Sequence, residues 1–350
     1  MNNRNIRQGV VSSSALRGGG VTNCDIRHRS ELFNELISTQ NIFLAWDRFV
    51  KGKHSKSDVQ AFARRLEDNL FDLQDQLRSG TYQHDPYHAF IIHDPKRRQI
   101  HKSTVKDRIV HQAITNVIEP FFERQFIYDS YSCRVGKGTH AAVRRLADCL
   151  DRLSRNNKEN IWVLKCDIKK FFASVDHRLL FSLLGKKISD KTVLELLLLV
   201  INSFSVKSGK GIPLGNLTSQ LFANVYLNEL DQFVKHELRC QYYLRYCDDF
   251  VLLNQDRLVL EDYLSQLNVF LQDKLQLRLH ERKVCFRKYS QGIDFLGYVV
   301  LPFGIVLRTK TKNRMLKRVN ESNVSSYLGL CSHARAYSLE QTIKNKIYLK

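Results

Sequence analysis

Apolar residues recur every three or four positions along the first part of the chain. Between Ser30 and Ser79 this spacing occurs twice, and each time it gives a helix one apolar face. Gly80 follows the second stretch, where a glycine can end a helix in the left-handed conformation. The pattern therefore predicts two helices, with apolar faces built from Leu32, Leu36, Phe43, Trp46 and Val50, then Phe62, Leu66, Leu70, Leu73 and Leu77.

Further along the chain, short apolar runs alternate with longer helical patterns. The predicted strands are 88–93, 161–166, 242–246, 250–253, 284–286, 292–300 and 305–307. The predicted helices are 105–122 (ending around Pro120), 178–201, 217–238 and 258–275, and a basic turn is expected at 94–98. The order strand, helix, helix, hairpin, helix, strand predicts an α+β fold with a split βαβ sheet of the ferredoxin-like kind.

The charge of the chain narrows its possible partners. Lys and Arg number 55 against 35 Asp and Glu, which gives a net charge of +20. A surplus this large favours a polyanionic partner, because each neutralised phosphate releases condensed counterions. A solubility or membrane-surface effect is the alternative, but the basic residues are spread along the chain and mixed with aromatic residues. The charge therefore favours nucleic acid.

The N-terminal segment and the apolar runs indicate where in the cell the protein is expected. Residues 1–29 are polar and basic and contain Gly and Ser, which predicts a flexible basic arm. No signal-peptide core is visible there, and the longest apolar run, 194–201, is far shorter than the ~20 residues that cross a bilayer. The eight cysteines form no C-x-x-C pair, and we expect them to be reduced thiols. We expect a cytoplasmic protein without a membrane partner.

Acidic residues end or join apolar strands at two places. In WVLKCDIKKFFASVDH a hydrophobic strand leads to Asp167, and in YYLRYCDDFVLL two apolar strands flank Asp248 and Asp249. A solvated turn would explain an isolated Asp-Asp pair, but Asn-Gly makes the easier turn between strands this apolar. Phosphoryl transfer needs two divalent ions ~3.5–4 Å apart, held by hard oxygen ligands. Convergence of the three carboxylates therefore predicts a two-metal phosphoryl-transfer site.

The segment Tyr246-Cys247-Asp248-Asp249 resembles the Y-x-D-D box of reverse transcriptases. Further boxes of that family follow in the same order over about residues 30–340, namely KDRIVHQAI, YSCRVGKGTHAAV, the Asp167 segment, GIPLGNLTSQLFANVYLNELD, LHERKVCF, GIDFLGYVV and SYLGLCSHARAY. The resemblance implies a right-hand polymerase with fingers, a ferredoxin-like palm and a short helical thumb. The corresponding ranges are an N-terminal arm at 1–29, fingers at 30–125, a palm with interleaved fingers elements at 126–305, and a thumb at 306–350.

The resemblance also implies roles for residues near the carboxylates. Asp167 and Asp248 would hold both metal ions, with the Ile168 carbonyl as a further ligand and Asp249 nearer to the primer end. The ions would be two Mg²⁺, with Mn²⁺ as an alternative. Lys283 lies where the family places a lysine that can protonate the leaving pyrophosphate, although in this sequence it belongs to a basic cluster.

Nucleotide and template contacts are implied at other positions. Phe172 matches the bulky residue that excludes a 2′-hydroxyl, although packing beside Phe171 would also explain it. Arg108 could grip the triphosphate of an incoming dNTP bidentately. Lys102 and Arg98 could contribute as well, with a solvated basic turn as an equal alternative. Contacts with the template or the RNA/DNA duplex are expected at Arg134, Lys137 and Tyr246.

The nucleotide-pocket helix departs from the Q-G-x-x-x-S-P pattern of group II intron and retron-like enzymes. Here Leu214, Gly215, Ser219 and Gln220 form the pattern L-G-x-x-x-S-Q, which resembles the reverse transcriptases of diversity-generating retroelements. Those bacterial or phage enzymes copy a template RNA with errors at adenines, in mutagenic retrohoming, alongside a small basic accessory variability protein. An aliphatic residue in place of glutamine removes directional contacts worth roughly 1–3 kcal/mol each. We expect Leu214, Gly215 and Gln220 to line the nucleotide pocket.

Two alternatives remain at the level of sequence. The first is another bacterial reverse transcriptase, of retron, group II intron-derived or phage-defence type. The second is a catalytically silent RNA-binding protein with the same fold, because a fold does not guarantee chemistry. All three carboxylates, Phe172 and Arg108 are present, which favours an enzyme.

Overall fold

Four antiparallel strands form the central sheet of the structure, a computed structural model that describes residues 31–93 and 97–348. Its strands are β3 (Trp162–Asp167), β4 (Tyr242–Tyr246), β5 (Asp249–Asn254) and β6 (Cys285–Lys288), in the order β4-β5-β3-β6. Because β5 lies between β3 and β4 and is antiparallel to both, β3 and β4 form a split βαβ unit. The predicted ferredoxin-like sheet is therefore confirmed.

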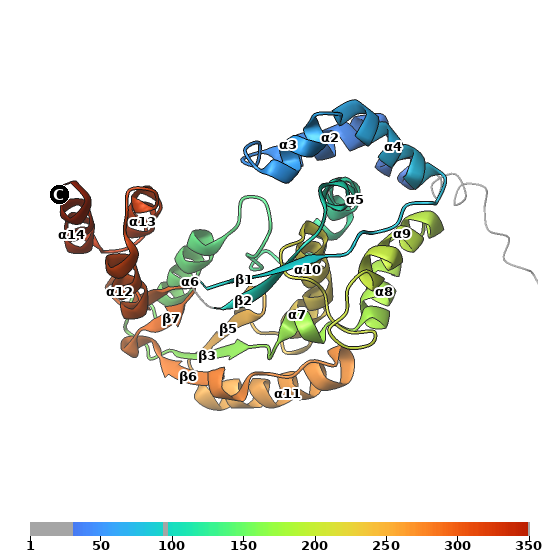
Figure 1. The fold of residues 1–350 in the computed structure, drawn as a ribbon. Helices are drawn as coiled ribbons and strands as arrows, with labels where there is room; N and C mark the ends of the chain where they lie inside the picture. Colours follow the sequence, from blue (N-terminus) through green and yellow to red (C-terminus); the bar gives the residue numbers. More distant parts are fainter. Residues whose placement is uncertain (1–30, 94–96, 349–350) are drawn as a thin grey trace, which may run out of the picture.

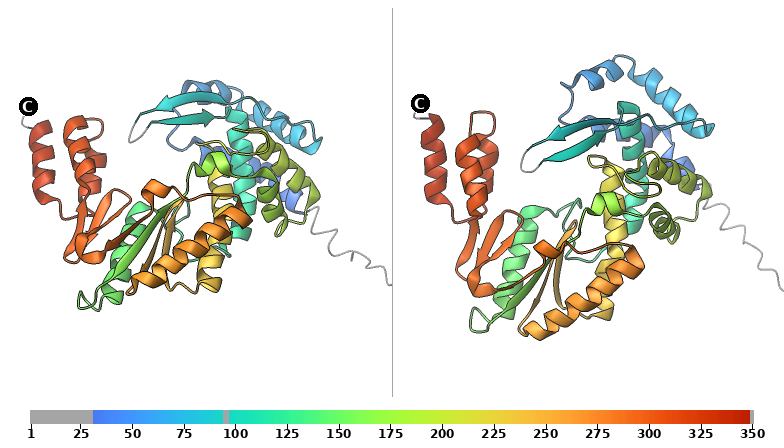
Figure 2. Two further views of the ribbon diagram at one scale, coloured as in Figure 1. Left: turned by 90° about the horizontal axis from the view of Figure 1, so that it is seen from below. Right: turned by 60° about the horizontal axis from the view of Figure 1, so that its bottom comes forward.

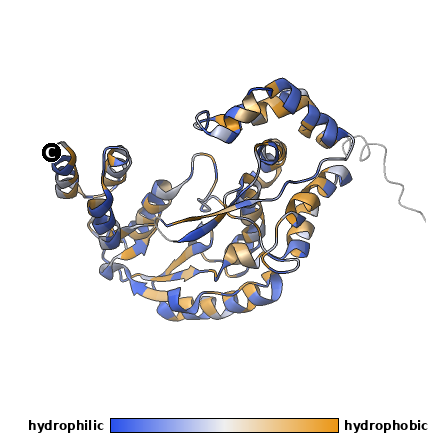
Figure 3. Cartoon of the chain, viewed as in Figure 1, coloured by the Kyte–Doolittle hydropathy of each residue, from blue (hydrophilic) through white to orange (hydrophobic). Residues whose placement is uncertain are grey.

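Helices cover both faces of this sheet. On one face lie α10 (Leu217–Gln232), which a π-helical turn extends over Phe233–Glu237, and α11 (Arg257–Leu275). On the other face lies α6 (Thr139–Leu153), beside a second, three-stranded sheet. Side chains of β3 alternate between the faces, since Leu164 and Cys166 pack with the first cluster and Val163 with the second. The inner strands β3 and β5 are consequently rich in apolar residues (Figure 3), whereas the edge strand β6 contains Arg287 and Lys288.

The N-terminal helices form an arch over α5 (Figure 1). The helices are a stretch at 31–36, α2 (Thr39–Val50), α3 (Ser57–Ala63) and α4 (Leu66–Arg78). The prediction of only two helices was wrong, because Ser38 ends the first stretch and caps α2 by accepting a hydrogen bond from the Asn41 amide. Gly80 ends α4 with φ 71°, as predicted.

A two-stranded hairpin leads from this arch into α5. Its strands are β1 (His88–Ile92) and β2 (Arg98–Lys102), so Arg98 belongs to a strand rather than to the predicted basic turn. The rest of that turn includes residues 94–96, which lie outside the described residues. The following helix, α5 (Val105–Glu123), contains Pro120 instead of ending there. A proline in the last turn removes only one intrahelical hydrogen bond, so the helix continues to Glu123.

The predicted helix at 178–201 is in fact two helices. They are α8 (His177–Gly185) and α9 (Lys191–Asn202), preceded by the short α7 (Phe171–Ser174). The buried Asp190 separates α8 from α9, because its side chain accepts hydrogen bonds from the Thr192 and Val193 amides and starts a new helix.

The C-terminal part combines a small sheet with three helices. A predicted single strand at 292–300 is a hairpin of β7 (Ile293–Phe295) and β8 (Tyr298–Leu301), because Leu296 and Gly297 turn the chain with positive φ. The sheet ends with β9 (Gly304–Leu307). Then follow α12 (Thr309–Arg318), α13 (Val324–Cys331) and α14 (Tyr337–Tyr348), which stand beside the central sheet in both views of Figure 2.

Two further expectations concern the N-terminal arm and membrane-spanning helices. The predicted arm at 1–29 lies outside the described residues. Within the described part of the chain, none of the helices is both long enough and apolar enough to span a bilayer.

Candidate active site

The sheet brings the three predicted carboxylates to one end. Asp167 is the last residue of β3 and lies directly opposite Asp249, the first residue of β5. Directly opposed residues of antiparallel strands have Cα atoms about 4.5–5.5 Å apart and side chains on the same face. Asp248 lies in the two-residue turn between β4 and β5. The two acidic segments of the sequence thus form one site.

The turn that carries Asp248 has an unusual backbone. Cys247, its first residue, has φ 55°, a left-handed conformation that is uncommon for a residue other than glycine. The Ile168 amide donates to the Asp248 carbonyl at 3.1 Å and holds the turn against β3. In an extended strand the carbonyl of a residue points to the same edge as its amide, so the Ile168 carbonyl also faces the turn.

The local electrostatics favour a cation. Burial raises the pKa of Asp248, and the carboxylates of Asp249 and Asp167 raise it further. Each acidic group makes ionisation of its neighbours more costly, so a positive charge nearby would stabilise all three. Lys283 supplies one such charge, because its ammonium group donates to both oxygens of the buried Asp167, at 2.8 Å to Oδ2.

The donor atoms suit a hard divalent ion, although the side chains are not arranged around one. Carboxylate oxygens and the Ile168 carbonyl are the ligands that Mg²⁺ prefers. Within residues 31–93 and 97–348, no three acidic, histidine or cysteine side chains converge as a ready metal site. The Asp167 carboxylate holds the Lys283 ammonium instead, which shows that this position already accepts a cation.

Phe172 lies beside the carboxylates on α7. Phe171 is fully buried in the core, whereas Phe172 is half-buried, with ring centroids 5.3 Å apart in an edge-to-face pair. The Phe172 carbonyl accepts from the Ile212 amide at 2.8 Å, which ties α7 to the segment before α10. Phe171 thus supplies the core packing, and the ring of Phe172 stays partly accessible.

The predicted pocket loop is bound to the hairpin strand β2. The Leu214 carbonyl accepts from the His101 amide at 3.0 Å, and Gly215 has φ 111°. A Cβ at Gly215 would lie 2.8 Å from the Ile100 side chain, so the close approach of β2 requires glycine. Gln220 is exposed in the first turn of α10. The sequence had given no sign that β2 docks on this loop.

Two of the three predicted triphosphate contacts converge on one acidic residue. Asp58, on α3, accepts from Lys102 at 2.7 Å and from Arg108 at 2.5 Å, and these cations lower its pKa to about 2 against the opposing effect of burial. The Arg108 guanidinium also lies 4.8 Å from the Phe49 ring centroid. Arg98 is exposed on β2. Lys102 and Arg108 therefore form a site that already binds an oxyanion.

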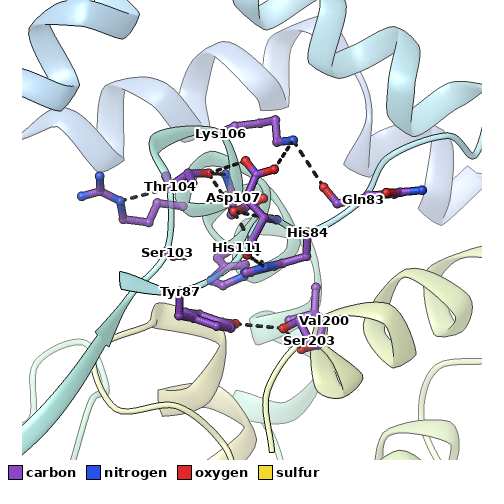
Figure 4. Close-up of polar contacts among 12 residues, drawn as sticks. Gln83, His84, Tyr87, Ser103, Thr104, Lys106, Asp107, His111, Val200 and Ser203 are labelled. Atoms are coloured by element: carbon purple, nitrogen blue, oxygen red, sulfur yellow. Dashed lines mark hydrogen bonds and ion pairs between the residues drawn. The ribbon is translucent and has the colours of Figure 1, made fainter. Parts of the chain in front are cut away.

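A buried polar cluster surrounds the start of α5, the helix that carries Arg108 (Figure 4). Asp107 is fully buried and accepts from the Tyr82 and Thr104 hydroxyls, both at 2.7 Å. The His84 and His111 rings meet at 3.2 Å between their Nε2 atoms, and Tyr87 reaches Ser203 at 2.9 Å. Because Arg108 follows Asp107 directly, this cluster sets where the Arg108 side chain begins.

The three predicted nucleic-acid contacts have different surroundings. Arg134 is turned inward, with a side chain only 6% exposed that pairs with Glu123 and donates to two carbonyls of its own loop. It holds the loop rather than presenting a charge to solvent. Lys137 is half-exposed, 3.5 Å from the Tyr128 ring centroid, and the half-buried Tyr246 accepts from Thr139.

Comparison with known proteins agrees with this geometry. The model of the reverse transcriptase (RNA-dependent DNA polymerase) family matches residues 93–300, more than half of the chain. The chain therefore belongs to the reverse transcriptase family, whose members are RNA-directed DNA polymerases and generally use divalent metal ions.

Two curated relatives match most of the chain. Protein YkfC of Escherichia coli (strain K12) is 30% identical over 71% of this chain and 76% of its own length. The group II intron-encoded protein LtrA of Lactococcus lactis subsp. cremoris is 23% identical over 90% of this chain, which spans 63% of LtrA.

A solved structure shares the fold. Apo telomerase from Candida tropicalis has a TM-score of 0.51 at 11% identity, covering 68% of this chain and 50% of its own. A likeness this distant supports the mixed helix-and-sheet reverse transcriptase fold alone.

Proposed function

We propose that this chain copies a template RNA into cDNA at the site formed by Asp167, Asp248 and Asp249, with two Mg²⁺ ions, or Mn²⁺ in their place. The observation that carries this proposal is the register of β3 and β5, which sets Asp167 opposite Asp249 beside the Asp248 turn. In this proposal the chain is a right-hand polymerase. The N-terminal helices and the β1–β2 hairpin are the fingers, the central sheet is the palm, and α12–α14 are the thumb.

The residues of the chain would share the work of phosphoryl transfer. Asp167, Asp248 and the Ile168 carbonyl would hold the ions, and Asp249 would lie nearer to the primer end. When bound, the ions supply activation of the primer 3′-hydroxyl and stabilisation of the charge on the leaving pyrophosphate. Lys283 would leave Asp167 and donate a proton to the pyrophosphate, a role supported by its position on that carboxylate.

Nucleotide selection would depend on two further groups. Lys102 and Arg108 would bind the triphosphate of the incoming dNTP in exchange for Asp58, with Arg98 nearby on the same hairpin. The half-buried ring of Phe172 would exclude a 2′-hydroxyl. Lys137 and Tyr246 would contact the template or the duplex, and Arg134 would act by shaping the loop that carries Lys137.

We further propose that the enzyme belongs to the error-prone branch found in diversity-generating retroelements. The supporting feature is Leu214, whose carbonyl is bound to β2 and whose side chain is aliphatic where a glutamine would offer hydrogen bonds. The proposal includes mutagenic retrohoming with a small basic accessory protein. A group II intron-derived enzyme is the second candidate, favoured by the likeness to LtrA.

Sequencing of the cDNA made by the purified protein would separate these branches. The protein should misincorporate opposite template adenines, and Leu214→Gln should restore accuracy there while leaving errors at other bases unchanged. Accurate copying of adenines by the unmodified protein, with and without a co-purified accessory protein, would favour the intron-derived candidate.

A further inference from the structure

The side chain of Arg245 lies fully buried behind the Cys247–Asp248 turn, here called the catalytic turn because it carries Asp248. All five N–H donors of this side chain make hydrogen bonds. Its Nε and Nη2 donate to the two oxygens of Asp231 at 2.7 and 2.6 Å, and Nη2 also donates to the Ser130 hydroxyl at 3.0 Å. Its Nη1 donates to the Asn224 side chain and to the Cys247 carbonyl, both at 3.3 Å. The last contact joins this network to the residue that precedes Asp248.

The partners of Arg245 come from three separate segments. Asn224 and Asp231 lie on α10, Ser130 lies on the loop before α6, and Cys247 lies in the turn. The backbone agrees with this arrangement, because the Arg245 amide donates to the Asp129 carbonyl at 2.9 Å. The guanidinium therefore has fixed surroundings and cannot follow the turn if the turn moves.

The conformation of the catalytic turn depends on hydrogen bonds from residues outside the turn. Cys247 has φ 55°, a conformation that residues with a Cβ adopt only when their surroundings impose it. Its carbonyl belongs to the peptide that links Cys247 to Asp248, so rotation of that peptide would redirect the Asp248 carboxylate. Arg245 holds that carbonyl on one side, while the Ile168 amide holds the Asp248 carbonyl on the other.

We propose that Arg245 is a positioning residue, which fixes the Cys247–Asp248 peptide and so aims the Asp248 carboxylate at the metal ions. This inference rests on the proposed role of Asp248 as a metal ligand. Asp231 accepts from two of the five N–H groups, so the buried guanidinium needs further acceptors, and one that it uses is the Cys247 carbonyl beside Asp248. The additional bond to the Cys247 carbonyl links the pair to the reaction.

The test is Arg245→Lys in the full chain, assayed by primer extension on an RNA template. Lysine keeps the charge beside Asp231 but cannot reach five acceptors. We expect kcat to fall by about tenfold to a hundredfold, the cost of a misplaced catalytic group, with KM for dNTP nearly unchanged. The Mg²⁺ concentration for half-maximal activity should rise several-fold.

Tyr243→Phe is the matched control, because the Tyr243 hydroxyl donates to the same buried Asp231 at 2.8 Å without touching Cys247. It should lower Tm, yet keep the kcat and Mg²⁺ dependence of the unmodified protein. If Arg245→Lys does not fold, Asp231→Asn replaces it, since the altered partner would redirect the guanidinium and should give the same kinetic change.

Three results would overturn this inference. One is unchanged kcat and Mg²⁺ dependence in a folded Arg245→Lys protein. Another is the same kinetic change in Tyr243→Phe, which would make the network a structural feature only. The third is activity that survives in Asp248→Asn in the same assay, which would overturn the proposed site itself.

Discussion

Two buried polar networks flank the proposed active site, and they differ in how many of their polar groups have hydrogen-bond partners. Behind the catalytic turn, Arg245 and Asp231 are fully buried, and each N–H donor of Arg245 has an acceptor. At the start of α5, Asp107 is equally buried, but Nδ1 of His111 has no hydrogen-bond partner among the described residues.

This difference predicts different behaviour. A saturated ion pair keeps one geometry, because any movement costs several hydrogen bonds at once. The α5 network leaves Nδ1 of His111 without a partner among the described residues, so fewer hydrogen bonds hold this network in one geometry. We infer that the first network fixes the Cys247–Asp248 turn, while the second holds the proposed nucleotide-binding residues less firmly.

The largest expected loss of stability comes from a change in the network around Arg245. Asp231→Leu would leave the buried Arg245 guanidinium without its counter-charge, and should lower the free energy of unfolding by about 3–5 kcal/mol. Urea denaturation followed by circular dichroism measures this loss. A change below 1 kcal/mol would mean that solvent reaches the guanidinium and that the two networks do not differ as described.

The second largest expected loss of stability comes from acidification and arises in the α5 network. Burial, with smaller contributions from the neighbouring His84 and Arg108, lowers the pKa of His111 to about 3. The unfolded chain takes up this proton near pH 6.5 and the folded protein does not, so stability is lost as pH falls from 6.5 towards 3. Between pH 7 and pH 5 this group should reduce the free energy of unfolding by about 2 kcal/mol.

His111→Gln provides the matched comparison for that prediction. Glutamine keeps a polar partner for His84 but does not titrate, so the variant should lose less stability on acidification than the unmodified protein. The two pH profiles, measured by urea denaturation, should diverge below pH 6.5. Parallel profiles would show that His111 does not carry the acid sensitivity.

The smallest expected loss of stability comes from removing a single hydrogen bond of the α5 network. Tyr82→Phe removes the hydroxyl that donates to Asp107 at 2.7 Å. Two further donors, the Thr104 hydroxyl and the Asp85 amide, remain on that carboxylate, so the loss in unfolding free energy should be about 1–2 kcal/mol. A thermal melt measures it, and a loss as large as that of Asp231→Leu would contradict the contrast between the networks.

The sequence predicted the parts of the molecule that depend on local pattern. The apolar runs around Asp167 and around the Asp248–Asp249 pair identified the strands, and the order of elements predicted the sheet. The breaks at Ser38 and Asp190 were missed, because a single capping residue splits a helix without changing its apolar spacing.

The long-range contacts could not be predicted from the pattern. Asp58 lies about fifty positions from its partner Arg108, and Asp231 is separated from the catalytic turn by a helix end and a strand. Arg134 fits a basic contact loop in the sequence, yet folds inward onto Glu123. Spacing along the chain identifies charged residues but does not show which of them will pair.

The most direct test of the central claim is primer extension on an RNA template by Asp248→Asn beside the unmodified protein. Asparagine keeps the shape of the side chain and removes the charge that the ions require. We predict that DNA synthesis by the unmodified protein requires Mg²⁺ and that the variant folds with a normal Tm but makes no product. A folded Asp248→Asn protein that still extends the primer would contradict the proposed site.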